Sequence, residues 1–136
     1  MKTVFLDSDV LLDLTLKRPD FVLPMLNLID LIQNGKLKAV TSPIVFVNVN
    51  YFLNKYNRPN KTSLLGYVRS ILNIIEVDET TIDKALKSGI TNFEDAVQYH
   101  AALTANADFI ITRNIKDYKQ ATIPVLTAEQ FLRTLS

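Results

Sequence analysis

Apolar and polar positions are distributed along the chain in blocks that predict five short strands separated by helices. Runs rich in β-branched and aromatic residues, bounded by polar or turn residues, are typical of buried strands. Such runs occupy residues 3–6, 37–41, 74–77, 108–112 and 123–126. Because strands and helices alternate, the pattern predicts an α/β fold whose parallel sheet is flanked by helices on both faces.

Between the strands, apolar residues recur at helical spacing, and several of these segments begin with a capping residue. The first two predicted helices cover residues 10–16 and 21–33, and the third runs from Ser42 and Pro43 to about Asn57. The next three begin at Thr62 or Ser63, at Asp78, and after Thr91 and Asn92. The last runs from Thr127 to near Leu135. Residues 113–118 are expected to form a polar loop. No repeat or linker interrupts the pattern, so residues 1–136 are expected to form one domain.

The amino-acid composition excludes several kinds of functional site. The 136 residues include no cysteine, which excludes disulfides, thiolate metal sites and thiol nucleophiles. A net charge of +1 means that a nucleic acid would have to be held by a local basic patch. The N-terminus lacks the pattern of a signal peptide and no apolar run is long enough to span a membrane. We therefore expect a cytoplasmic protein with no membrane contact.

Polar oxygen ligands follow the first and fourth predicted strands. Asp7 ends the first strand, at the edge of an α/β sheet where ligands bind, and Asp9 is close by. If these two strands are neighbours, later residues reach the same edge. These later residues are Glu94 and Asp95 at the start of an alanine-rich helix, and Asn114 and Asp117 after the fourth strand. Clustered carboxylates without cysteine indicate a hard divalent ion, Mg²⁺ or Mn²⁺.

Each of these residues also has a plainer interpretation. Asp7 is equally suited to capping the helix that follows it. Glu94 and Asp95 lie in the first turn of a helix, where the helix dipole favours acids. Arg113 and Lys116 belong to a small basic cluster, which is either a solvated loop or, beside a metal site, a contact for a nucleic-acid backbone.

Three segments, read together, resemble the PIN domain family, and most closely its VapC-like branch. They are FLDSDVLLD at residues 5–13, NFEDAVQY at residues 92–99 and ITRNIKDY at residues 111–118, and residues 125–132 extend the match. The resemblance implies a five-stranded parallel sheet of order 3-2-1-4-5. It also implies a metal-dependent endoribonuclease, commonly the toxin of a type II toxin–antitoxin pair, with Asp7, Asp95 and Asp117 as catalytic acids and metal ligands.

The chain departs from that family at Asn48, where a glutamate is usual on the helix after the second strand. An amide oxygen can bind metal or water but carries no charge, and Glu94 is expected to compensate in part. The resemblance places further residues at the site: Asn48 and Asn114 as ligands of metal or water, and Ser8, Asp9, Arg113 and Lys116 near the substrate.

The leading hypothesis is therefore a Mg²⁺- or Mn²⁺-dependent nuclease that hydrolyses RNA phosphodiesters. The alternative is a catalytically weak or inactive PIN module that binds RNA or a partner protein, which the neutral Asn48 favours. A receiver-like signalling domain ranks last, since no lysine lies near the end of the last strand. The apolar helices at residues 22–32 and 44–53 predict a homodimer, and the family implies a cognate antitoxin.

Overall fold

The computed structural model describes residues 1–56 and 59–135, and its centre is a five-stranded sheet. The strands are β1 (Lys2–Leu6), β2 (Leu37–Thr41), β3 (Asn73–Ile74), β4 (Phe109–Ile111) and β5 (Val125–Leu126). Their order is β3-β2-β1-β4-β5, and every neighbouring pair is parallel. This confirms the predicted sheet, with β1 at its centre and β4 directly beside it.

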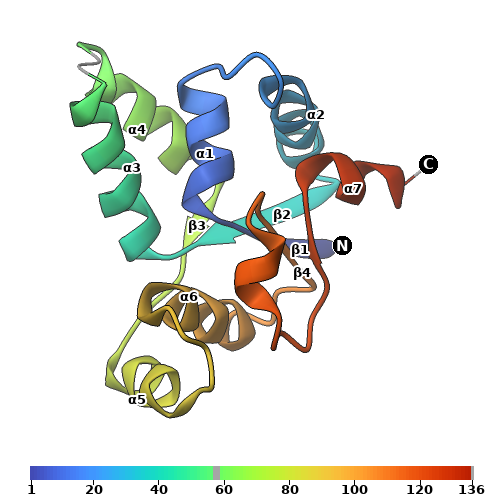
Figure 1. The fold of residues 1–136 in the computed structure, drawn as a ribbon. Coiled ribbons are helices and arrows are strands. Elements are labelled where there is room, and N and C mark those ends of the chain that lie inside the picture. The colour runs from blue at the N-terminus through green and yellow to red at the C-terminus, as the bar shows by residue number, and fades with distance from the viewer. Residues whose placement is uncertain (57–58, 136) are drawn as a thin grey trace.

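Helices cover both faces of the sheet, as predicted (Figure 1). They are α1 (Ser8–Thr15), α2 (Val22–Gln33), α3 (Pro43–Lys55), α4 (Lys61–Ile71), α5 (Glu79–Lys87), α6 (Phe93–Thr104) and α7 (Ala128–Arg133). Figure 1 shows α5 and α6 on one side of the sheet and α1, α2 and α7 on the other. None of the helices in the described part of the chain has both the length and the hydropathy that a bilayer crossing requires.

Local sequence accounts for most helix starts. Ser42, Asp78 and Thr127 each accept a hydrogen bond from a backbone N–H in the first turn, which confirms these three predicted caps. Asn92 caps α6 in the same way, through the N–H of Asp95. Asp7 caps α1, so the capping interpretation of that residue holds alongside any chemical role.

The core forms around the central strand. Val4, Phe5 and Leu6 are fully buried because helices cover both faces of β1. In a sheet with one face exposed to solvent, buried and exposed residues would alternate along the strand. The last residues of β1 pair with the last residues of β4, Leu6 with Ile111. The chain segments that follow these two strands therefore leave the sheet side by side.

Four predicted elements differ in the structure. The fifth strand was predicted at residues 123–126 but comprises only Val125–Leu126, which pair with Ile110 and Ile111 of β4. The third strand was predicted at residues 74–77 but comprises only Asn73–Ile74, since its neighbour β2 ends at Thr41 and Ser42 then turns the chain into α3. Residues 113–118 were predicted as a loop, but Ile115–Tyr118 forms a 3₁₀ turn, η1, whose last residue is buried. The helix predicted to fade at residues 57–59 ends at Lys55, and residues 57–58 lie outside the described residues.

Candidate active site

Asp7 stands where β1 ends, and its buried carboxylate accepts hydrogen bonds from Ser8, Thr112 and Tyr118. The N–H of Ser8 donates to Oδ1 at 2.8 Å, while the hydroxyls of Thr112 and Tyr118 donate to Oδ2 at 3.1 and 3.0 Å. These bonds favour the ionised form, but burial outweighs them and raises the pKa of Asp7 above its ordinary value. The protein thus keeps a costly carboxylate at the carboxyl edge of its central strand.

Asp9 faces Asp7 across the hydroxyl of Thr112. That hydroxyl lies 3.1 Å from Asp7 Oδ2 and 3.1 Å from Asp9 Oδ2, yet it has only one proton to donate. The backbone N–H of Arg113 also donates to Asp9 Oδ2, at 2.9 Å. Burial, followed by the charge of Asp7, raises the pKa of Asp9 to about 6. The two carboxylates therefore repel one another across a single shared donor.

Two further acids approach this pair from α6 and η1. Burial raises the pKa of Asp95 to about 6, and the next contributions come from the negative charges of Asp7 and Asp117. Residues more than 80 positions apart in the chain thus act on one another electrostatically. The charges of Asp7 and Asp117, two of the acids that the sequence placed at the site, therefore reach Asp95, the third, as does the charge of Asp9.

Glu94 belongs to the same negative region but turns toward α3. Its Oε1 accepts a hydrogen bond of 2.6 Å from Nδ2 of Asn48. The charge of Glu94 adds to the rise in the pKa of both Asp7 and Asp95. Asn48, the neutral residue on α3, is therefore directly linked to an acid of α6.

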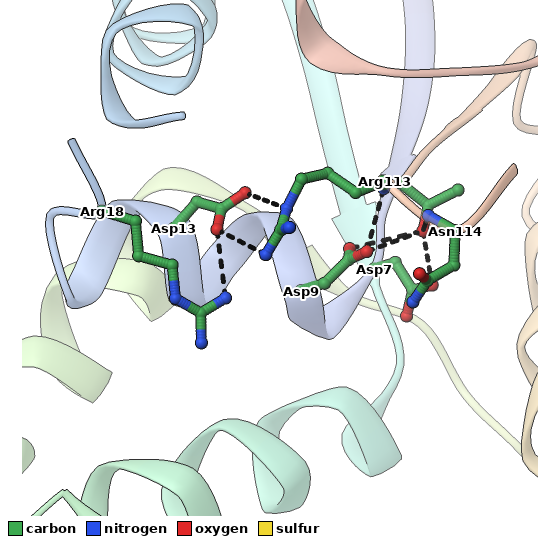
Figure 2. A network of polar contacts seen from close by, with 7 residues as sticks. Asp7, Asp9, Asp13, Arg18, Arg113 and Asn114 are labelled. Carbon is green, nitrogen blue, oxygen red and sulfur yellow. Dashed lines mark hydrogen bonds and ion pairs between the residues drawn. The ribbon is translucent and has the colours of Figure 1, made fainter. Parts of the chain in front are cut away.

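Arg113 forms an ion pair with Asp13, a buried acid that the sequence did not place at the site. Its Nε and Nη2 donate to Asp13 at 2.9 and 3.0 Å, and Nη1 of Arg18 donates to the same carboxylate at 3.1 Å (Figure 2). The guanidinium also lies 4.1 Å from the centre of the Phe21 ring. Asp13 has a side-chain exposure of 2%, so this pairing compensates for a desolvated charge and joins the segment after β4 to α1.

The residues predicted to contact substrate therefore divide into two groups. The backbone of Ser8 and the carboxylate of Asp9 make bonds within the site, and the guanidinium of Arg113 is paired with Asp13 instead of projecting outward. Lys116 is exposed, and it lines a cleft together with Lys119, Asp95 and Asp117. A substrate contact at each of these positions stays a prediction, and Lys116 has the most accessible side chain.

Asn114 links the segment after β4 to the acids through its backbone. Its N–H donates to the Thr112 hydroxyl at 3.1 Å (Figure 2). The residue itself is exposed. Because Thr112 accepts this bond, its one proton remains available to Asp7 or Asp9. The position of Asn114 beside these acids is compatible with the ligand role predicted for it.

The donor set suits a hard divalent cation. Asp7, Asp9, Asp95 and Asp117 offer carboxylate oxygens, and burial together with neighbouring negative charge raises the pKa values of Asp7, Asp9 and Asp95. A bound cation would offset that negative charge. Across residues 1–56 and 59–135, no three acidic, histidine or cysteine side chains are already gathered as a metal-binding group. Binding an ion thus requires these side chains to turn toward a common point.

Sequence reasoning missed three residues that shape this site: Thr112, Tyr118 and Asp13. Tyr118 lies in the segment predicted to be a polar loop, yet it is only 3% exposed and its hydroxyl donates a hydrogen bond to Asp7. Asp13 was visible as a charge inside the apolar run that follows Val10, a pattern that calls for a partner. That signal identifies a buried acid but not its partner, which lies 100 residues away.

Comparison with known proteins agrees with this arrangement. The sequence matches the family model described as PIN domain over residues 3–116. It is 29% identical over 133 residues to Ribonuclease VapC1 of Aquifex aeolicus (strain VF5), covering 94% of this chain and 92% of that protein. The fold is similar to that of VapBC2 from Rickettsia felis bound to a promoter DNA fragment, with a TM-score of 0.67, 23% identity, and 91% and 96% of the two chains covered. A toxin–antitoxin complex from Klebsiella pneumoniae gives a TM-score of 0.66, 22% identity, and coverage of 92% and 97%.

Proposed function

Because the chain belongs to the PIN domain family, we propose that it is a metal-dependent endoribonuclease that hydrolyses RNA phosphodiesters. The observation that supports this most directly is the electrostatic coupling of Asp7, Asp95 and Asp117, which come from three separate elements. The similar protein from Aquifex aeolicus is a ribonuclease by name and aligns over nearly its whole length. The proposal concerns the edge of the sheet where β1 and β4 end.

In this proposal Asp7, Asp95 and Asp117 hold Mg²⁺ or Mn²⁺, and Asn114 contributes an amide oxygen or orients water. When bound, such an ion activates a water molecule and offsets the negative charge that builds up on the phosphodiester. The hydroxyls of Thr112 and Tyr118 hold Oδ2 of Asp7, and the N–H and hydroxyl of Ser8 hold Oδ1, so the carboxylate is fixed in orientation. Burial and the charge of Asp7 raise the pKa of Tyr118, so this hydroxyl keeps its proton and remains a donor at neutral pH.

The cleft beside the acids supports a path for the RNA backbone. Lys116 and Lys119 line it together with Asp95 and Asp117, so cations stand next to the acids. Phosphate groups are attracted to lysine, while the acids without a metal ion would repel them. We infer that the strand enters over these lysines and that a divalent ion is needed to bring a phosphate to the acids.

We further propose that the protein is the toxin of a toxin–antitoxin pair and forms a homodimer. Structures of similar fold include a toxin–antitoxin complex, which supports an antitoxin partner. Large apolar side chains are exposed on both α2 and α3, and they support a contact with another protein chain. These side chains are Leu23, Leu26, Val47 and Tyr51.

The test is cleavage of a mixed tRNA and rRNA preparation by the purified chain in Mg²⁺, Mn²⁺ or EDTA. We expect cutting in either metal, none in EDTA and none by Asp7→Asn, while the exposed surface change Asp83→Asn retains full activity. Equal cutting by Asp7→Asn would refute the nuclease assignment. Metal-dependent RNA binding without cleavage would instead support the binding module that the neutral Asn48 favours.

A further inference from the structure

A second cleft adjoins the first cleft, which is the one that contains Asp95 and Asp117. The two clefts share three lining residues, Gly89, Ile90 and Gln120, so they meet. Where they meet, the side-chain amide of Gln120 donates a hydrogen bond of 3.0 Å to the carbonyl oxygen of Gly89. The segment between α5 and α6 is thus joined to the segment that follows η1, and both segments border both clefts.

The second cleft carries two lysines from α5, Lys84 and Lys87, and is called the lysine cleft below. Both side chains are exposed and lie three positions apart in the last turn of that helix, so they project from the same side of it. Among the described residues that line the lysine cleft, none is acidic. His100 also lines it, but burial lowers the pKa of this ring, so the positive charge here comes from the two lysines.

The helix dipole alone favours lysine in the last turn of a helix. A lysine that only complemented the dipole of α5 could lie on any side of the helix, yet Lys84 and Lys87 both line the lysine cleft. Neither forms an ion pair with an acid within residues 1–56 and 59–135. Their ammonium groups are therefore available to an anionic ligand.

Lys116 and Lys119 continue this row of cations through the first cleft to the acids. Four exposed lysines thus follow two joined clefts, in a chain whose net charge is only +1. A ligand that matches this arrangement carries negative charges at regular intervals along a flexible chain. A single RNA strand has that form, since each nucleotide adds one phosphate.

From this geometry we propose that the lysine cleft binds the phosphate backbone of the RNA strand beyond the position at which the strand is cut. Lys84 and Lys87 each contact a phosphate there, and the strand passes Gly89 and Gln120 on its way to the first cleft. The inference rests on the proposed function, because it extends the path of that function's substrate. Part of the affinity for RNA therefore arises outside the first cleft.

The experiment measures binding of a fluorescently labelled, mixed-sequence single-stranded RNA to the full chain by fluorescence anisotropy at several salt concentrations. EDTA is present, so that the strand is not cut. The double variant Lys84→Gln/Lys87→Gln is compared with Lys36→Gln/Lys38→Gln, which removes the same charge. Lys36 and Lys38 are exposed at the amino end of β2, at the opposite edge of the sheet from Asp7. Circular dichroism melting establishes that both variants are folded.

Each phosphate contact on a single strand steepens the logarithmic dependence of affinity on salt by about 0.7, which corresponds to about fivefold in affinity at about 0.1 M salt. We therefore expect Lys84→Gln/Lys87→Gln to bind the RNA about 25-fold more weakly than the unchanged protein, with a slope shallower by about 1.4. Lys36→Gln/Lys38→Gln should keep the slope and lose little affinity. In Mg²⁺, the lysine-cleft variant should cut RNA with a raised KM and little change in kcat, because the acids are untouched.

Equal affinity and slope in the lysine-cleft variant and the unchanged protein would overturn the inference. An equal loss in the control variant would also overturn it, since RNA would then respond to net charge alone. If the lysine-cleft variant binds RNA normally but loses affinity for poly-glutamate, the cleft belongs to an acidic protein partner and the inference falls. In each of these cases, metal-dependent cutting by the unchanged protein leaves the proposed function standing. If the unchanged protein neither binds nor cuts RNA, the proposed function and this inference fail together.

Discussion

Replacing Asp9 with asparagine should stabilise the metal-free protein at neutral pH. Asparagine has nearly the same shape and retains an oxygen that can accept from the N–H of Arg113. It removes one of the two charges that face each other across Thr112. The substitution thus tests whether burial of this charge, together with repulsion from Asp7, destabilises the fold.

The magnitude follows from the pKa of Asp9, which is about 6 in the protein and 3.8 when solvated. Each pKa unit corresponds to about 1.4 kcal/mol, so the ionised side chain costs the fold about 3 kcal/mol at pH 7.5. Because the folded state binds the proton more tightly than the unfolded state, this cost is absent below pH 4 and develops as the pH rises toward 6. The gain from Asp9→Asn should therefore shrink to about 1 kcal/mol at pH 4.5.

The assay is urea unfolding in EDTA at both pH values, with Asp83→Asn as a surface control that should change little. Millimolar Mn²⁺ should reduce the difference in the free energy of unfolding between Asp9→Asn and the unchanged protein at pH 7.5, since a bound cation offsets the same repulsion. Equal stability of Asp9→Asn and the unchanged protein at pH 7.5 would refute the reasoning. So would a gain that is as large at pH 4.5.

Three other predictions concern the surroundings of the site. Tyr118→Phe should lower the free energy of unfolding by about 2 kcal/mol, because it removes a hydrogen bond to buried Asp7; a loss below 0.5 kcal/mol would show that this bond is not needed. Arg113→Met should cost about 3 kcal/mol and Arg18→Met about 1, since Arg113 makes two of the three bonds to Asp13; urea unfolding giving the reverse order would contradict this. Mn²⁺ should raise the melting temperature strongly at pH 7.5 and weakly at pH 5, where protons compete for carboxylates with a pKa of about 6; a pH-independent shift in thermal melting would place the ion elsewhere.

Much of the fold was predictable because its causes lie close together in the sequence. Ser42, Asp78 and Thr127 cap helices through backbone N–H groups only three residues away. The buried run before Asp7 needs helices on both faces, and the alternation of elements supplies them. The strand order was inferred from the family resemblance, and the pairing of β1 with β4 confirms it.

The candidate site was predictable only in part. That acids follow β1 and lie near the segment after β4 was expected, and in the structure the charges of Asp7 and Asp117 contribute to the raised pKa of Asp95. Their catalytic and metal-binding roles stay predictions. The pairing of Arg113 with Asp13 could not be foreseen, because nothing local in either segment selects the partner.

The sequence by itself determined the order and type of the main strands and helices and that Asp7 follows the first strand, because periodicity and capping act over a few residues. Tertiary structure alone decided how these strands and helices face each other. It brings Tyr118 and Thr112 to the same oxygen of Asp7, and it lets Asn48 donate a hydrogen bond to Glu94. Such pairings depend on the packing of elements far apart in the chain. Small differences in the position of a helix or turn change which donor reaches which carboxylate, and no local pattern records them.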